Sequence, residues 1–279
     1  MRSSRIAGRR AAAAASAVLA AVALAGCDAG GAGSILDKST LRIGVKADQP
    51  GLGLKRPDGT FEGFDVDVAR YVAGRLGFAE EDITFVETPS SVREQALQER
   101  RVDMIVATYS ITAGRKTKVT FAGPYYVAHQ DTLVRAGDGA VRNVRDLSGR
   151  RLCKVTGSNS WRRVTEERKV PARLVETSSY SDCVNRLLSG ELDAVSTDDL
   201  ILAGFAARYG DRVKIINAPI SDEKYGIGLH KGDIDGCEAI NTALTQMYQD
   251  GTARRLLDKW FGRTSLRTNP YVPQFEGCG

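Results

Sequence analysis

The stretch that most constrains the fold is residues 104–126, where an unbroken apolar run stops at a group of small hydroxyl side chains. Residues 104–107 are typical of a strand buried on both faces, as in a parallel sheet. Such sheets bind ligands in the crevice beyond the carboxyl ends of their strands. Four polar residues occupy that end: Thr108, Tyr109, Ser110 and Thr112. The pattern therefore predicts a ligand site at this edge of an α/β fold.

A single arginine, Arg115, follows this group in a loop that Gly114 should allow to turn. The rigid fork of donors on a guanidinium matches a carboxylate better than a lysine ammonium does. The alternative is an ordinary exposed arginine in a hydrophilic loop, which is where most arginines lie. Its position just after the hydroxyl group favours the carboxylate.

The first 26 residues are typical of an export signal. They hold four arginines and no acid, followed by an Ala/Val/Leu run that is short for a membrane span. The run ends in Leu24-Ala25-Gly26-Cys27, which resembles the lipobox of bacterial lipoproteins. We therefore expect cleavage before Cys27 and lipidation of its thiol, with residues 27–39 as a flexible tether.

Without this signal the chain is nearly neutral. The whole chain has 39 basic and 34 acidic residues, and removal of four arginines leaves 35 against 34. This balance favours neither nucleic acid nor an acidic membrane surface as a partner. About 240 residues remain, which is enough for one large α/β domain or two lobes with separate cores.

Alternating apolar and polar residues predict a first strand over Leu41–Val45, with Lys46 at its end. Apolar residues spaced four apart then predict a helix over residues 64–76. Asp65 and Asp67 fall in the first turn of this helix, where the helix dipole alone accounts for two acids. We expect neither carboxylate to touch a ligand.

The sequence Ser91-x-x-Glu94 follows a predicted strand over residues 83–86 and matches a capping box, so a second helix should begin there. Ser90 and Arg93 then lie in or beside its first turn. A cation in the first turn opposes the helix dipole. Arg93 therefore indicates that an anion sits near this helix start.

The second half of the chain begins another βα unit. A strand over Arg151–Val155 leads into the small, donor-rich loop 156–160, which precedes a helix near Trp161. Exposed amides at a helix N-terminus bind anions, although small polar turns before helices are also common as purely structural features. Both interpretations of this loop stay open.

A helix over Tyr180–Ser189 follows, and then a strand over residues 194–197 that ends on two acids. We expect the second acid, Asp199, to cap the next helix.

These motifs, in this order, resemble the extracellular solute-binding proteins of family 3, which deliver polar amino acids to ABC importers. The similarity covers about residues 41–261 and rests on the buried strand, Ala107-Thr108-x-Ser110-x-Thr112, Arg115-Lys116, Val119-x-Phe121 and Pro124-Tyr125-Tyr126. It implies a type II periplasmic-binding-protein-like α/β fold: two lobes, mixed sheets flanked by helices, and two crossover hinge segments near Val134 and Gly226. Lobe 1 should comprise residues 40–134 and 224–279, and lobe 2 residues 135–223.

The resemblance also implies roles for individual residues. The α-carboxylate of a bound amino acid should meet Arg115, Ser110, Ser158 and Asn159, and its α-ammonium should meet Asp198 and Thr108. In glutamate- and aspartate-binding relatives, the ligand side chain is met by the positions that match Lys46, Ser90, Arg93 and Tyr180. One departure is that residues 49–54 hold no aromatic residue, whereas many members cover the ligand with one there.

Four cysteines remain once Cys27 is lipidated, and an even number in an exported protein favours two disulfides, with three possible pairings. In the lobes that the resemblance implies, a bond between lobes would prevent the cleft from opening. We therefore predict one bond inside lobe 2, Cys153–Cys183, and one inside lobe 1, Cys237–Cys278. Metal binding is the alternative, but the sequence has no Cys-x-x-Cys and both histidines lie far from every cysteine.

Three classes of function are compatible with this sequence. The first is a passive receptor that closes on a free amino acid and presents it to an ABC permease, and the second is a sensor that reports to a membrane partner. The third is an enzyme, because a few relatives of the fold are dehydratases, but catalysis needs a poised acid or base and the candidate site holds charged clamps and hydroxyls. We expect a monomeric, non-enzymatic binding protein without metal or cofactor, lipid-anchored at the outer face of the cytoplasmic membrane.

Charge indicates which amino acid is bound. Arg115 and Asp198 match a zwitterion and cancel each other, whereas Arg93 and Lys46, if they face the cleft, add positive charge that a neutral side chain cannot compensate. L-Glutamate is therefore the expected ligand, with L-aspartate weaker because of its shorter side chain. Glutamine or asparagine is the alternative, and it requires Arg93 and Lys46 to be solvated surface cations.

Overall fold

The structure is a computed structural model that describes residues 33–279. The expected signal and Cys27 lie outside the described residues. The end of the expected tether is part of the folded chain, because a short 3-10 helix over Ile35–Asp37 packs against the start of a later helix. Asp233 accepts hydrogen bonds from Ser34 Oγ at 2.7 Å and from the Ile35 amide at 2.8 Å. Folded structure thus begins before residue 40.

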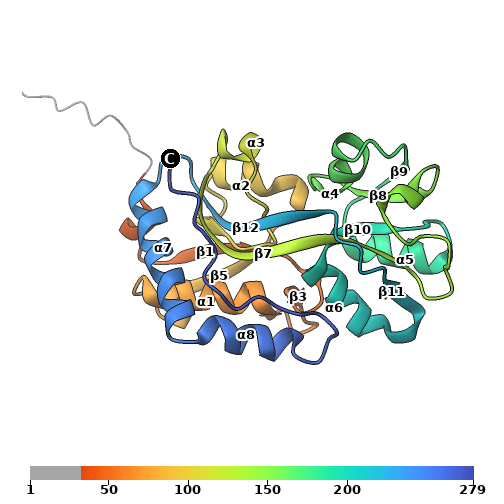
Figure 1. Cartoon of the computed structure of the whole chain (residues 1–279). Coiled ribbons are helices and arrows are strands. Elements are labelled where there is room, and N and C mark those ends of the chain that lie inside the picture. The colour runs from red at the N-terminus through yellow and green to blue at the C-terminus, as the bar shows by residue number, and fades with distance from the viewer. Residues whose placement is uncertain (1–32) are drawn as a thin grey trace, which may run out of the picture. The chain divides into compact units, whose positions relative to one another are not determined.

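One seven-stranded sheet runs through the described chain, in the order β10-β7-β12-β6-β1-β5, with β11 also paired to β7 (Figure 1). Strand β1 pairs in parallel with β5 and β6, and β12 pairs antiparallel with β6 and β7. The bounds of these strands are β1 Leu41–Val45, β5 Ile83–Glu87, β6 Met104–Ile105, β7 Thr120–Arg135, β10 Val195–Asp198, β11 Val213–Ile215 and β12 Ser221–Leu229. Residues 104–107 are fully buried, as the apolar run predicts, and the site residues follow directly.

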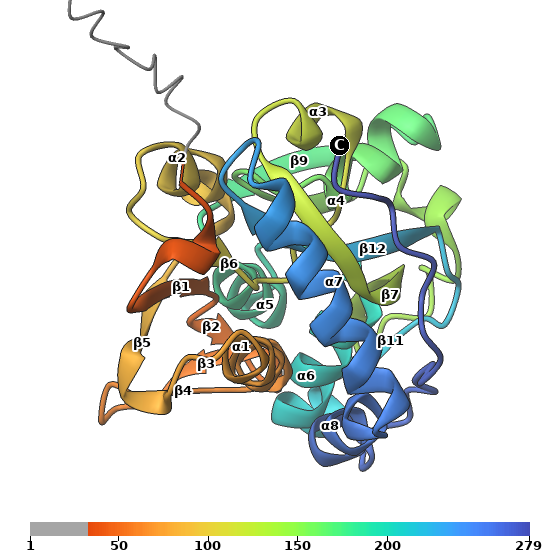
Figure 2. The same ribbon diagram turned by 90° about the vertical axis from the view of Figure 1, so that its left-hand side faces the viewer.

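Lobe 1 surrounds the β6-β1-β5 part of this sheet. It contains a small sheet of β2 Asp48–Gln49, β3 Gly53–Lys55 and β4 Phe61–Glu62, and the helices α1 Phe64–Arg75, α2 Arg93–Gln98, α3 Ala113–Lys116, α7 Ile234–Gln249 and α8 Thr252–Phe261. Figure 2 shows α1, α7 and α8 grouped beside the sheet. The core between them is rich in aromatic rings, with Phe64 within 6.4 Å of Tyr125, Tyr126 and Phe261, measured between ring centroids. This packing fixes the strand ends that carry the site.

Lobe 2 is built on β10 and the parallel pair β8 Arg151–Val155 and β9 Arg173–Thr177. Its helices are α4 Ser160–Arg162, which continues as a π-helical turn over Arg163–Glu167, α5 Tyr180–Ser189 and α6 Asp199–Tyr209. The bounds of α5 are those that the sequence predicts. Loop 156–160 leads directly into α4, so its residues lie at the carboxyl end of β8.

Two strands, β7 and β12, cross between the lobes and pair with each other from Ser221↔Gln130 to Leu229↔Thr120. Strands β10 and β11 of lobe 2 pair with the last residues of β7, from Gln130 to Arg135. The first crossover therefore lies before Gln130, and not near Val134 as expected. The second contains a register shift between Tyr225 and Ile227, around the expected Gly226.

The structure joins Cys153 to Cys183 and Cys237 to Cys278, each with a Cα–Cα distance of 5.8 Å. The first bond links β8 to α5 within lobe 2. The second ties the C-terminal segment to α7 in lobe 1. This is the pairing that keeps both bonds away from the opening between the lobes.

Three local expectations are wrong. The Ser91-x-x-Glu94 capping box does not form, because a 3-10 turn over Ser90–Val92 moves the start of α2 to Arg93, and the cap position, Val92, has no side-chain hydrogen bond. Arg115 lies on the one-turn helix α3, capped by Thr112, and not in a loop turned by Gly114. Asp198 occupies the cap position of α6, and Asp199 is the first helical residue. Among the described residues, no helix has the length and apolarity needed to span a membrane.

Candidate ligand-binding site

The two lobes touch on both sides of the candidate site. Ser181 at the start of α5 donates from its amide to Asp48 Oδ2 at 3.1 Å and from its hydroxyl to the Asp48 carbonyl at 2.7 Å. The loop before α4 packs so closely on the 3-10 turn Ser90–Val92, which precedes α2, that a Cβ added to Gly157 would lie 2.4 Å from the Ser90 carbonyl oxygen. Gly157 also has a φ of +79°, so only glycine fits this contact without strain. Side chains from both lobes therefore share one enclosed polar region.

Arg115 connects the lobes at one end of this region. Its Nη1 donates to the Ser110 carbonyl at 2.8 Å in lobe 1, and its Nη2 donates to the Gly157 carbonyl at 3.0 Å in lobe 2. Its Nε lies 3.3 Å from Glu94 Oε1. The guanidinium is buried, and its two Nη atoms face Ser110 and the loop that holds Asn159.

Asp198 provides the acidic group at the other end of this polar region. Its Oδ2 accepts a hydrogen bond from Tyr225 OH at 2.7 Å, and its Oδ1 is buried without a hydrogen-bond partner in the described chain. Burial, and after it the charge of Glu223, raises the pKa of Asp198 to about 8. An ammonium group at Oδ1 would supply the missing donor and lower that pKa. The Thr108 carbonyl, also expected to meet the ammonium, lies 3.3 Å from Arg93 Nη1.

Arg93 and Lys46 form a cationic group inside lobe 1. They are only 2% and 4% exposed, so neither is a surface cation. Arg93 Nη1 donates to the carbonyls of Ala107 at 3.0 Å and Thr108 at 3.3 Å, while its Nε has no partner, and Lys46 Nζ donates to Ser90 Oγ at 2.6 Å. Within residues 33–279 neither side chain makes an ion pair with a carboxylate.

The electrostatic cost of this arrangement appears in the pKa values. Burial, followed by the charge of Arg93, lowers the pKa of Lys46 to about 7. Burial, followed by the charge of Arg115, lowers the pKa of Arg93 to about 10. Two buried cations close to a third favour an anion between them, because an anion would offset both the desolvation and the mutual repulsion.

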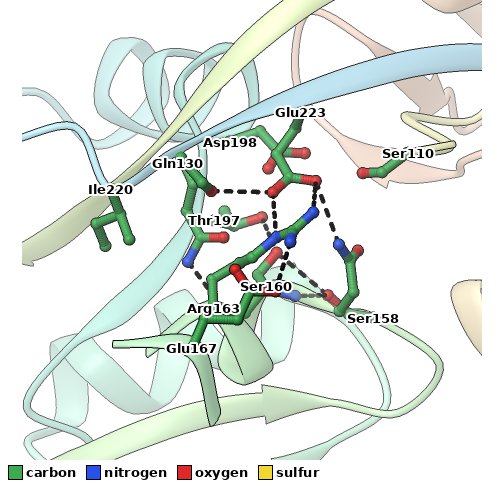
Figure 3. A network of polar contacts seen from close by, with 12 residues as sticks. Ser110, Gln130, Ser158, Ser160, Arg163, Glu167, Thr197, Asp198, Ile220 and Glu223 are labelled. Carbon is green, nitrogen blue, oxygen red and sulfur yellow. Dashed lines mark hydrogen bonds and ion pairs between the residues drawn. The ribbon is translucent and has the colours of Figure 1, made fainter. Parts of the chain in front are cut away.

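Lobe 2 contributes a layer of hydroxyl groups opposite. Tyr180 OH lies 2.7 Å from Ser158 Oγ and 3.0 Å from Ser160 Oγ, and Ser160 Oγ lies 3.2 Å from Thr197 Oγ1. Figure 3 shows Ser158, Ser160 and Thr197 in one polar network with Asp198, which lies beside Glu223 at the other end of that network. The structure thus brings Ser158 and Tyr180 together with the acid at the end of β10.

Glu223 belongs to this region and sequence reasoning missed it. It lies on β12, is 1% exposed, and accepts from Arg163 Nε at 2.7 Å and from Asn159 Nδ2 at 3.2 Å (Figure 3). Asn159 Oδ1 in turn accepts from Arg115 Nη1 at 3.4 Å. Asn159 therefore links the carboxylate clamp to the second crossover strand. In sequence Glu223 falls between Asp222 and Lys224 in a charged run, which gives no sign that it points inward.

Asp65 is the second missed residue, and the helix-dipole explanation for it is wrong. It is completely buried, and its carboxylate accepts from the Thr108 amide at 2.8 Å and from Tyr125 OH at 2.7 Å. It thereby holds the site residue Thr108, whose φ of +45° is unusual for a residue other than glycine. Asp65 lies four and eight positions before Ala69 and Ala73, on the buried face of α1, and this helical spacing could have predicted that its side chain is buried. Asp67 instead accepts from Trp260 Nε1 and Lys259 Nζ of α8, each at 2.7 Å.

Cavities open toward both ends of the site. One of about 330 Å³ is lined by Lys46, Asp48, Ser91 and Tyr180. A larger open one of about 840 Å³ is lined by Arg115 and Asn159, among others. Both are in the size range of small-molecule sites. Among the described residues there is no cluster of three or more His, Cys, Asp or Glu side chains that could hold a metal ion.

Comparison with known proteins identifies the family. Residues 41–263 match the bacterial extracellular solute-binding proteins, family 3. The chain is 41% identical over 270 residues to the glutamate-binding protein GluB of Corynebacterium glutamicum, covering 91% of each chain. It is 36% identical over 230 residues to the ABC transporter glutamine-binding protein GlnH of Bacillus subtilis, covering 81% of this chain and 83% of that protein.

Solved structures agree with this assignment. An ancestral arginine-binding protein bound to arginine superimposes with a TM-score of 0.74 at 32% identity, over 81% of this chain and 99% of that chain. An ancestral amino acid-binding protein described as a precursor of cyclohexadienyl dehydratase gives a TM-score of 0.73 at 30% identity, over 82% and 100%. GluB and GlnH are both named as binding proteins. The resemblance and the type II fold predicted from the sequence are confirmed, and the chain belongs to the family 3 extracellular solute-binding proteins.

Proposed function

We propose that the protein binds L-glutamate outside the cytoplasmic membrane and delivers it to an ABC permease, with L-aspartate as a weaker ligand. The observation that carries the choice of ligand is the burial of Arg93 and Lys46 without a carboxylate partner in the described chain. The identity of 41% to the glutamate-binding protein GluB supports the same choice.

In this proposal each part of the ligand meets one part of the site. The α-carboxylate meets Arg115 and Ser110 from lobe 1 and Ser158 and Asn159 from lobe 2, and the α-ammonium meets Asp198. These charges cancel. The side-chain carboxylate then offsets the charges of Arg93 and Lys46, with Ser90 and Tyr180 beside it.

A glutamine side chain has the same length but carries no charge, so it would leave both cations without an ion-pair partner, with only the more distant charges of Glu94, Asp48 and Asp65 to offset them. Aspartate supplies the charge but is one methylene shorter and reaches less far from the α-carboxylate clamp. The glutamine-binding relative GlnH keeps glutamine as the alternative ligand. A role as an amino-acid sensor would use the same site and the same closure.

Closure of two lobes follows from ligand contacts on both sides, because a ligand that touches both lobes favours the closed form. We place the pivot on β7 and β12, with the first crossover before Gln130 and the second around Gly226. The protein acts as a monomer, held at the outer face of the membrane through a lipidated Cys27.

Calorimetric titration of the chain from residue 28 onward with the common L-amino acids tests the proposal. Glutamate should bind most tightly, aspartate more weakly, and glutamine at least tenfold more weakly than glutamate. Glutamine binding tenfold more tightly than glutamate, a difference of about 1.4 kcal/mol, would overturn the choice of ligand. Small-angle scattering on the same samples should show a more compact particle at saturation.

A further inference from the structure

One aromatic ring lies beneath both guanidinium groups of the candidate site. The ring of Tyr109 is fully buried, and its centroid lies 4.3 Å from Arg93 Cζ and 5.0 Å from Arg115 Cζ. Tyr109 stands between Thr108 and Ser110 in sequence, at the carboxyl end of the buried run, so the ring is anchored by the backbone that forms the site. No role for this side chain follows from the proposed ligand contacts.

The Tyr109 ring is also packed against residues of the two crossover strands. Its centroid lies 4.7 Å from that of Phe121 on β7, with 65° between the ring planes. Gly228 on β12 approaches it so closely that an added Cβ would lie 2.9 Å from Tyr109 Cε1. The Tyr109 carbonyl accepts from the Gly226 amide at 3.0 Å. The ring therefore has little freedom to shift when the lobes move.

The face of an aromatic ring carries negative potential and attracts a guanidinium, most strongly where water is excluded. Arg93 and Arg115 repel each other, and Arg93 has no acidic hydrogen-bond partner in the described chain. A shared ring offsets that repulsion and fixes both guanidinium groups relative to one rigid object. The ring thus acts together with the backbone carbonyls that accept from Arg93 and Arg115 to set the distance between the two groups.

We propose that Tyr109 is a positioning residue, an inference that rests on the proposed function. It sets the spacing between Arg115, which binds the α-carboxylate, and Arg93, which binds the side-chain carboxylate. The protein thereby selects the chain length of a dicarboxylic amino acid. A ligand whose two carboxylates match this spacing engages both groups at once, and a shorter one engages only one of them well.

The phenol hydroxyl offers a matched control. Tyr109 OH is buried beside the Glu94 carboxylate and makes no hydrogen bond of normal geometry in the described chain. Y109F keeps the aromatic ring and removes only this hydroxyl, so it separates the effect of the ring from that of the contact with Glu94. Y109L keeps an apolar side chain but removes the ring face.

The experiment measures dissociation constants for glutamate, aspartate and glutamine by calorimetry in the wild-type protein, Y109F and Y109L, with thermal melts of each. Y109F should bind all three within about twofold of the wild type. Y109L should lose about tenfold or more in glutamate affinity, with a much smaller loss for aspartate, so that the glutamate-to-aspartate ratio falls at least about fivefold. A purely structural role would lower the melting temperature and weaken all three ligands by the same factor.

An unchanged glutamate-to-aspartate ratio in Y109L, in a wild-type background that prefers glutamate, would overturn the role of Tyr109 alone. A wild-type preference for glutamine would overturn the proposed function and this inference together. If Y109L does not melt cooperatively, Y109M replaces it, because methionine adapts to an irregular space, and the same ratio decides.

Discussion

Replacing Arg93 by methionine should weaken glutamate binding without destabilising the protein. Methionine has a comparable length and no charge, and Arg93 is 2% exposed with only two backbone carbonyls as hydrogen-bond acceptors in the described chain. Burial, followed by the charge of Arg115, lowers the pKa of this guanidinium from 12.5 to about 10. That shift corresponds to about 3 kcal/mol by which the protein alone disfavours the charged form.

R93M should lower the affinity for glutamate but should not lower the stability of the ligand-free protein. Removing the charged partner of a desolvated ligand carboxylate costs about 2–5 kcal/mol, so glutamate affinity should fall at least about 30-fold. Glutamine, which never used the charge, should bind as well as before or better. R93M removes the desolvation of a buried cation, about 3 kcal/mol by the pKa shift, and it also removes two hydrogen bonds to backbone carbonyls, each worth about 1.5–3 kcal/mol, so that the two effects on stability are of similar size and opposite sign. The ligand-free protein should therefore melt at about the wild-type temperature, since about 1 kcal/mol moves the melting temperature of a chain this long by about 2–4 °C.

The assay pairs calorimetric titration with thermal denaturation in the absence of ligand. R101M is the matched control, because the side chain of Arg101 is 49% exposed and pairs with Glu99 on the surface. It should change neither quantity. If R93M retained glutamate affinity within threefold, or lost stability in step with affinity, Arg93 would be a structural residue and the reasoning from its missing partner would fail.

Three further predictions follow from the same contacts. Arg115→Ala should weaken every L-amino acid by about 2–5 kcal/mol, and binding of any of them within twofold of the wild type would show that Arg115 is not the clamp. Because burial and Glu223 raise the pKa of Asp198 to about 8 and the ligand ammonium requires the ionised carboxylate, glutamate affinity should fall several-fold as the pH drops from 7 to 6, where protonation of Lys46, whose pKa is about 7, offsets only a small part of the loss; titrations that give the same affinity at both pH values would contradict this. Mass mapping of non-reduced peptides should recover Cys153 with Cys183 and Cys237 with Cys278, and a peptide joining Cys153 to Cys237 would refute the pairing.

Local sequence patterns predict helices and strands well where the spacing of apolar residues matches the side of the element that is buried. The apolar run at residues 104–107 is buried, and the strand ends where polar side chains begin. Arg93 was recognisable because its charge opposes the helix start, and that misplacement is visible without any tertiary contact. The capping box failed because its four-residue pattern cannot detect the 3-10 turn that shifts the helix start.

The residues that were missed share one property: their partners are distant in sequence. Asp65 meets Thr108, 43 positions away, and Glu223 meets Arg163, 60 positions away. An acid that accepts hydrogen bonds inside the protein looks, in sequence, like an acid on the surface. Only the fold shows which way such a side chain points.

The two crossover strands have a consequence for how opening would appear in hydrogen–deuterium exchange. Strands β7 and β12 hydrogen-bond to each other on both sides of the pivot, so the lobes can separate by bending this ribbon without breaking its ladder. Amides along the ribbon should exchange slowly whether or not glutamate is present. The amide of Ser181, which is bonded across the lobes to Asp48, should be slow only in the closed form.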